Sequence, residues 1–173
     1  MQRYQTTALM LAVTLFLGIT RTGFLQVPDT VGRAFTILHL PAILAGVFDG
    51  PLAGGAVGLT FGVIALFLYP PPDPVMHLLP RVLIGVVAGG LFQLVRRLAA
   101  RSPARNSLAA LVAALGGSLT NTLGVSLISV LRGSYALPDI LPVAVFHGSV
   151  EAILAVLFTV PPVVLLYSRK QRR

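Results

Sequence analysis

Long apolar stretches separated by short polar or proline-rich segments run through the whole sequence. A helix needs about 20 mostly apolar residues to cross the hydrocarbon core of a bilayer, and most of these stretches approach that length. Because a helix satisfies its own backbone hydrogen bonds, it is the structure such stretches adopt in lipid. The pattern predicts six membrane-spanning helices, with these bounds: residues 6–23, 36–47, 52–69, 76–98, 107–131 and 137–167.

The boundaries of these helices are set by turn-forming residues. Residues 26–32 make a polar, proline-bearing loop, and the succession Asp49, Gly50, Pro51 predicts a tight turn. The third helix ends at residues 70–74, which contain four prolines, because proline lacks the backbone donor that a helix needs. The second helix is short for a full crossing, so we expect neighbouring helices to shield it.

Composition indicates an all-α polytopic membrane protein. Hydrophobic residues make up 55% of the chain and charged residues 10%, and the mean hydropathy is +0.88. Gly54, Gly58 and Gly62 place small residues on one face of the third helix, where another helix can approach closely. The absence of cysteine excludes disulfides and thiolate ligands. We expect one transmembrane domain over residues 1–173, whose first helix is not cleaved as a signal peptide.

The distribution of basic residues predicts the orientation. Lys and Arg beside membrane spans are retained in the cytoplasm. Six spans put nine of them on the side of the termini and four on the other, which predicts that both termini are cytoplasmic. They mark topology and not a nucleic-acid surface, because no aromatic residues are interleaved with them. The nine are Arg3, Arg96, Arg97, Arg101, Arg105, Arg169, Lys170, Arg172 and Arg173; the four are Arg21, Arg33, Arg81 and Arg132.

Polar residues inside the predicted helices fall in the outer half of the membrane. Glu151 lies in the middle of the last apolar stretch, four residues after His147, and Arg81, Asn121 and His39 fall in the same half of the membrane. Ionisable residues in a span are costly and indicate a functional site. We expect these five residues to line an outward-facing pocket for a small polar solute. The alternatives are a direct pair between Arg81 and Glu151, and simple hydrogen bonds between helices.

Other chemistries find less support in the sequence. No nucleophile elbow or intramembrane-protease motif is present, so we do not expect an enzyme. A metal-binding permease subunit would use His39, His77, His147 and Glu151, since imidazole and carboxylate suit divalent metals, but their spacing matches no known signature. A structural membrane protein without a ligand is a further alternative. Because the sequence shows no nucleotide-binding motif and no inverted repeat, transport would need energy from a partner.

The first predicted helix offers a contact surface for such a partner. Ala8 and Ala12 stand four residues apart near the cytoplasmic end of a helix otherwise rich in Leu, Met and Phe. Small residues at this spacing let a second helix approach closely. The alternative is that the two alanines pack inside the protein itself.

Together these motifs resemble the substrate-binding S components of energy-coupling factor (ECF) vitamin transporters, in the group that includes the pantothenate components. The stretch Ala8-Leu-Met-Leu-Ala12 is similar to the family's first-helix AxxxA motif. The remaining similarities follow the family in order and spacing over nearly the whole chain: residues 37–46 and 50–62 for the second and third helices, 79–85 for the fourth, 117–122 for the fifth and 147–162 for the sixth.

The resemblance implies a multi-pass protein of the prokaryotic cytoplasmic membrane that captures a vitamin or related small molecule from outside. It also implies that the protein has no catalytic residue and no cofactor of its own. A transmembrane coupling subunit, on which Ala8 and Ala12 dock, and two cytoplasmic ATPases that use ATP complete the importer. The S component delivers its solute by toppling in the membrane. Many relatives carry Asn where this chain has His147.

The polar residues suggest the chemistry of the solute. Arg81 suits a carboxylate or phosphate, Asn121 an amide or hydroxyl, and Glu151 a hydroxyl or amine. The absence of tryptophan weakens the case for a large flat ring held by stacking. We therefore expect a small, flexible, hydroxylated acid, of which pantothenate is one example.

Overall fold

The computed structural model describes residues 4–26, 34–68, 73–100, 102 and 104–171. Within this part the chain forms six helices and one short hairpin, so the all-α class is confirmed. Helices α3 to α6 are each long and apolar enough to cross a membrane, and α1 and α2 are shorter apolar helices. In chain order the elements are α1 (Gln5–Ile19), β1 (Phe24–Gln26), β2 (Ala34–Thr36), α2 (His39–Asp49), α3 (Pro51–Leu68), α4 (Pro74–Leu98), α5 (Arg105–Leu131) and α6 (Leu137–Gln171).

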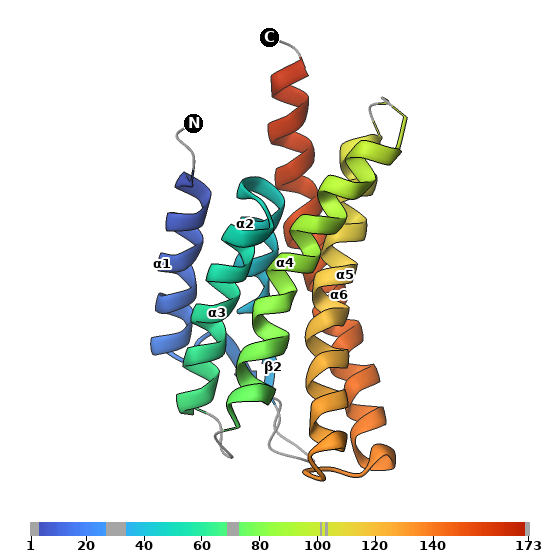
Figure 1. Ribbon diagram of the computed structural model, residues 1–173. Coiled ribbons are helices and arrows are strands. Elements are labelled where there is room, and N and C mark those ends of the chain that lie inside the picture. The colour runs from blue at the N-terminus through green and yellow to red at the C-terminus, as the bar shows by residue number, and fades with distance from the viewer. Residues whose placement is uncertain (1–3, 27–33, 69–72, 101, 103, 172–173) are drawn as a thin grey trace.

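Helix α2 lies at the centre of the bundle and contacts each of the other five helices (Figure 1). The sequence predicted a short, shielded helix here, and eight of its eleven residues are buried. Around it, α3 packs on α4, α4 on α5 and α5 on α6, while α1 lies at one edge against α2 and α3. The largest side chains of the buried core come from α2, α3 and α4 and the residue before α2: Phe61, Phe92, Leu38, Ile43, Ile84 and Val57.

Glycine sets the distance between α3 and α4. A Cβ atom added at Gly54 would lie 2.6 Å from the carbonyl oxygen of Gly85, and one at Gly62 would lie 2.8 Å from that of His77. Gly58, between them, would meet the carbonyl of Arg81 in the same way. The four-residue glycine period predicted from the sequence is thus confirmed as a close-packed face, and its partners on α4 follow the same period in the opposite direction.

The link between α1 and α2 differs from the prediction. Helix α1 ends at Ile19, four residues before the predicted end, and the chain then forms an antiparallel hairpin in which Phe24 pairs with Thr36. The pairing involves three residues on each side, too few to give a recognisable alternation in the sequence. Residues 27–33, most of the predicted polar loop, lie outside the described residues.

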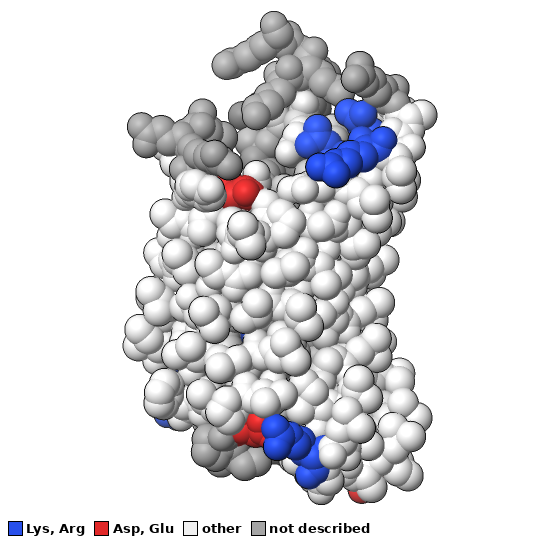
Figure 2. All heavy atoms as spheres, viewed as in Figure 1, with Lys and Arg blue, Asp and Glu red and all other residues white. Residues whose placement is uncertain are grey.

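Charge is concentrated at the two ends of the molecule, with an apolar band between them (Figure 2). The start of α1 and the end of α6 lie at the same end, as an even number of crossings requires (Figure 1). Arg96, Arg97 and Arg105 stand at the ends of helices that meet there. We refer to this as the predicted cytoplasmic end, and to the opposite end, which holds the hairpin and the start of α4, as the predicted outer end.

Candidate functional site

Glu151 is the centre of a buried polar cluster in the outer half of the bundle. Its side chain is 5% exposed. The backbone N–H of Thr36 donates to Oε1 at 3.1 Å, and Nδ2 of Asn121 donates to Oε2 at 3.3 Å. The hydroxyl of Thr122 lies at 3.5 Å from Oε2, a longer and weaker contact. These donors replace the water that a buried carboxylate needs, and they tie β2 and α5 to α6.

His39 fastens the start of α2 to the same place. The ring is fully buried, with Nδ1 at 2.7 Å from the carbonyl oxygen of Thr36 and Nε2 at 3.2 Å from the carbonyl oxygen of Glu151. Both partners are acceptors, so a neutral ring donates to one of them and a doubly protonated ring to both. The imidazole therefore bridges the end of β2 and the middle of α6.

Arg81, on α4, brings a cation close to this cluster. Its Nη1 donates to the carbonyl of Met76 at 2.6 Å, and the guanidinium carbon lies 5.5 Å from the ring centre of Phe61. Its Nε is buried and has no acceptor among the described residues. Glu151 acts electrostatically on the guanidinium, yet the direct ion pair considered from the sequence is not formed between these two described side chains. The cation thus keeps a free donor beside the carboxylate.

Asn121 has an unpaired acceptor, whereas Arg81 has an unpaired donor. Its side chain is 4% exposed, and while Nδ2 is used by Glu151, Oδ1 has no partner among the described residues. Buried polar atoms are seldom left without a hydrogen bond. One unpaired acceptor on α5 and one unpaired cationic donor on α4 are therefore available in the neighbourhood of a single carboxylate.

The hairpin is held on α6 by aromatic contacts as well as by Glu151. The ring of Phe35 lies 4.3 Å from that of His147 and 5.7 Å from that of Phe146. His147 is half-buried and stands one turn before Glu151 on α6. Its ring thus packs on β2, next to the cluster.

The five residues singled out in the sequence lie in one region, but they differ in how they contact one another. Glu151, Asn121 and His39 are linked by hydrogen bonds, Arg81 is a near neighbour of Glu151, and His147 packs on the hairpin. Sequence reasoning missed the donors from Thr36 and Thr122 and the rings of Phe35 and Phe61. Thr122 follows Asn121 directly, whereas a backbone N–H such as that of Thr36 has no signature in a sequence.

The metal-site alternative lacks a donor set in the described part of the chain. There, no three His, Cys, Asp or Glu residues are grouped so that they could hold a metal ion. Both ring nitrogens of His39 are already close to backbone oxygens.

Ala8 and Ala12 lie on the outside of the bundle. Both are exposed, whereas the buried residues of α1 are Thr7, Thr14 and Gly18. Packing of the two alanines inside the protein is therefore not observed. Leu15 and Ile19 continue the same exposed face, at positions i+7 and i+11 from Ala8, and we call these four residues the docking stripe.

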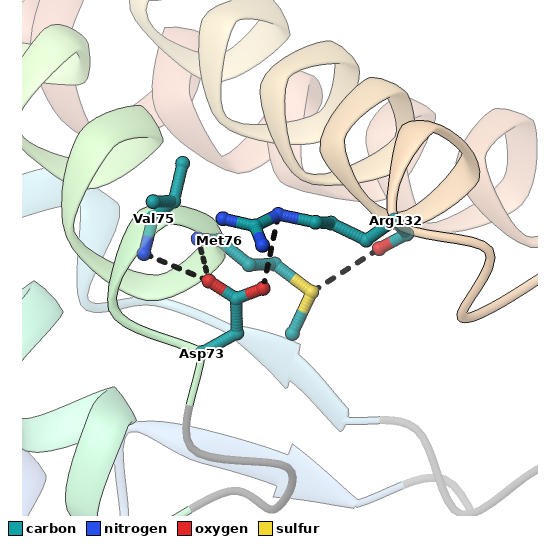
Figure 3. Close-up of polar contacts among 5 residues, drawn as sticks. Asp73, Val75, Met76 and Arg132 are labelled. Carbon is teal, nitrogen blue, oxygen red and sulfur yellow. Dashed lines mark hydrogen bonds and ion pairs between the residues drawn. The ribbon is translucent and has the colours of Figure 1, made fainter.

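At the predicted outer end, Asp73 joins α4 to the end of α5 (Figure 3). Its Oδ1 caps α4 by accepting from the backbone N–H groups of Val75 at 2.9 Å and Met76 at 3.2 Å. Its Oδ2 lies 3.5 Å from Nε of Arg132, which follows α5. One carboxylate thus serves as a helix cap and as an ion-pair partner at this end.

Comparison with known proteins agrees with this arrangement. The family model described as ECF transporter, substrate-specific component, matches residues 3–164. No curated protein sequence shows significant similarity to the chain. The match covers α1 to α5 and α6 up to residue 164, and it includes every residue of the polar cluster and of the docking stripe. The chain therefore belongs to the family of substrate-specific components of ECF transporters.

Proposed function

We propose that this component captures a small organic acid of vitamin size from outside and holds it in the outer half of the bundle. Arg81 binds the acid group, because its buried Nε lacks an acceptor and its charge is not neutralised by direct contact. The proposal rests on this unpaired, buried donor of Arg81. A hydroxyl or amide of the solute donates to Oδ1 of Asn121, which also lacks a partner among the described residues.

Glu151 has a different role from the one its sequence position suggests. Its oxygens already accept from Thr36, Asn121 and Thr122. The carboxylate therefore orients Asn121 and the hairpin, and its negative charge balances Arg81 in the absence of solute. A flexible hydroxylated acid such as pantothenate has the groups this set requires, one anion and several donors.

The family acts as part of a larger importer with coupling and ATPase modules. We propose that the docking stripe is the face of α1 that meets the transmembrane coupling subunit, because its two alanines permit close approach and its Leu and Ile supply apolar area. Two cytoplasmic ATPases then supply the energy, and the component reorients in the membrane to release its solute inward.

Native mass spectrometry of the gently purified protein tests the solute proposal. We expect a bound mass of vitamin size, its loss in Arg81→Gln, and its retention in Arg132→Gln, which removes an exposed arginine at the outer end. A titration with pantothenate and with its neutral amide analogue should show at least tenfold weaker binding of the amide, since the ion pair with Arg81 is lost. Equal binding of an acid and its amide, or full retention of the solute in Arg81→Gln, would reject the assignment.

A further inference from the structure

The first turn of α1 is held by an acid that belongs to another helix. Oδ2 of Asp49, the last residue of α2, accepts from the backbone N–H of Thr7 at 2.7 Å and from the Thr7 hydroxyl at 2.6 Å. The two residues are 42 positions apart in the sequence. Both bonds are short, as expected when the acceptor is charged.

The contact with Asp49 gives the start of α1 the hydrogen-bond acceptor and the negative charge that its own sequence lacks. The N-cap position gives no side-chain cap hydrogen bond, and the first turn contains no acid. The first N–H groups of a helix have no partner within it, and its positive end attracts an anion. Asp49 meets both needs from outside the helix, so it acts as a cap that also fixes α1 to α2.

Three buried residues of α1, together with partly buried side chains such as Leu11 and Leu17, place the helix on the bundle. Its buried residues are Thr7 in the first turn, Thr14 in the middle and Gly18 near the far end. At Gly18 an added Cβ would lie 2.6 Å from Ile64 of α3, so α1 is closely packed there. Leu15 and Ile19 are exposed on a different face of the helix. Gly18 therefore fixes one end of the helix and the pair of Thr7 and Asp49 the other, with partly buried apolar side chains between them.

We call the contact between Asp49 and Thr7 the clamp. Ala8 follows Thr7 directly, so the clamp lies in the same helical turn as the first residue of the docking stripe. We propose that Asp49 is a positioning residue for assembly: its contact with Thr7 holds the predicted cytoplasmic end of α1, and with it the docking stripe, in the orientation that the coupling module recognises. The inference rests on the proposed docking through α1. It assigns a role to a carboxylate that lies at the opposite end of α2 from His39 and the polar cluster.

The test compares four variants of the full-length protein in lipid nanodiscs for affinity toward the purified coupling and ATPase module. Asp49→Asn and Thr7→Val should each weaken assembly about tenfold, the effect of losing one charged hydrogen bond. The effects of the two changes should be less than additive in the double variant, because Asp49 is the acceptor of the hydroxyl bond that Thr7→Val removes. Thr7→Ser, which keeps the hydroxyl, should assemble normally.

Hydrogen exchange and the unfolding temperature distinguish a positioning role of Asp49 from a general contribution to the stability of the fold. Hydrogen exchange of the amides in the first turn of α1 should rise in Asp49→Asn, while the unfolding temperature changes little. Asp139→Asn, an exposed acid in the first turn of α6, is the matched control and should change none of these quantities. A large fall in unfolding temperature that accompanies the loss of assembly in both Asp49→Asn and Thr7→Val would overturn the positioning role.

Ala8→Leu serves as the reference for docking itself. If Ala8→Leu blocks assembly and Asp49→Asn assembles normally, the inference is wrong and docking through α1 stands. If both assemble normally, docking through α1 is rejected, and the role of Asp49 with it. Loss of assembly in both, with a normal unfolding temperature and faster exchange in Asp49→Asn, is the expected result.

Discussion

The backbone N–H of Thr36 and the carboxylate of Glu151 meet across 115 positions of sequence, at 3.1 Å. This bond attaches the hairpin that follows α1 to the middle of α6. His39 reinforces it, because its ring lies between the carbonyl oxygens of the same two residues. A conformational change of the hairpin would therefore have to break contacts at the residue that also orients Asn121.

Replacing Glu151 by glutamine tests how much its charge, as distinct from its size, contributes to stability and to solute binding. The amide has nearly the same size, but its NH₂ group must face a donor where an oxygen now accepts, either from Thr36 or from Asn121. We expect a loss of about 1–3 kcal/mol in the free energy of unfolding, measured by denaturant titration in micelles, and at least tenfold weaker solute binding. Asp139→Asn is the control for removal of a charge. Unchanged stability would contradict the arrangement of donors around Glu151.

The two partners of the outer ion pair should contribute unequally. The side chain of Arg132 is 53% exposed, so Arg132→Gln should lower the free energy of unfolding by less than about 1 kcal/mol. Asp73→Ala removes the cap of α4 as well as the ion pair, and should cost about 1–2 kcal/mol. Thermal unfolding of both variants decides the matter, and an equal loss in the two would mean that the cap contributes nothing.

The sequence pattern predicts the helices well, because lipid leaves few alternatives for long apolar stretches. The spacing of Gly54, Gly58 and Gly62 predicts a close-packed face, and α4 lies on it. The region in which His39 and Glu151 meet also follows from counting helical turns inward from the predicted surface.

Contacts between segments that are distant in the sequence could not be predicted from it. The hairpin forms from three residues on each side, and its Thr36 N–H is a donor that every residue except proline carries. The clamp of Asp49 on Thr7 joins residues that no motif connects. Packing likewise decides the partners of Glu151. It brings three hydrogen-bond donors to the carboxylate, and Arg81 forms no direct ion pair with it among the described residues.

Two glycines of α4 provide a matched test of helix packing. A Cβ at Gly85 would overlap the backbone of Gly54, much closer than van der Waals contact, whereas a Cβ at Gly90 would have nothing within 4 Å. We expect Gly85→Ala to lower the free energy of unfolding by several kcal/mol, since backbone atoms must move apart. Gly90→Ala should be neutral or slightly stabilising, because alanine favours the helix. A similar effect of the two changes on the unfolding temperature would contradict the close approach of α3 and α4.

The position of Arg81 depends on a glycine of α3. A Cβ at Gly58 would lie 2.9 Å from the carbonyl carbon of Arg81 and closer still to its oxygen, so Gly58→Ala must displace α4 at the residue proposed to bind the acid group. Gly62→Ala strains the same helix pair one turn away, at the carbonyl of His77. We expect similar losses of stability in both variants, because both force backbone atoms apart. Affinity for the acidic solute, measured by isothermal titration, should fall about tenfold more in Gly58→Ala, since a small misplacement of a charged group weakens its ion pair. Equal affinities in the two variants would mean that binding does not depend on where α3 holds Arg81.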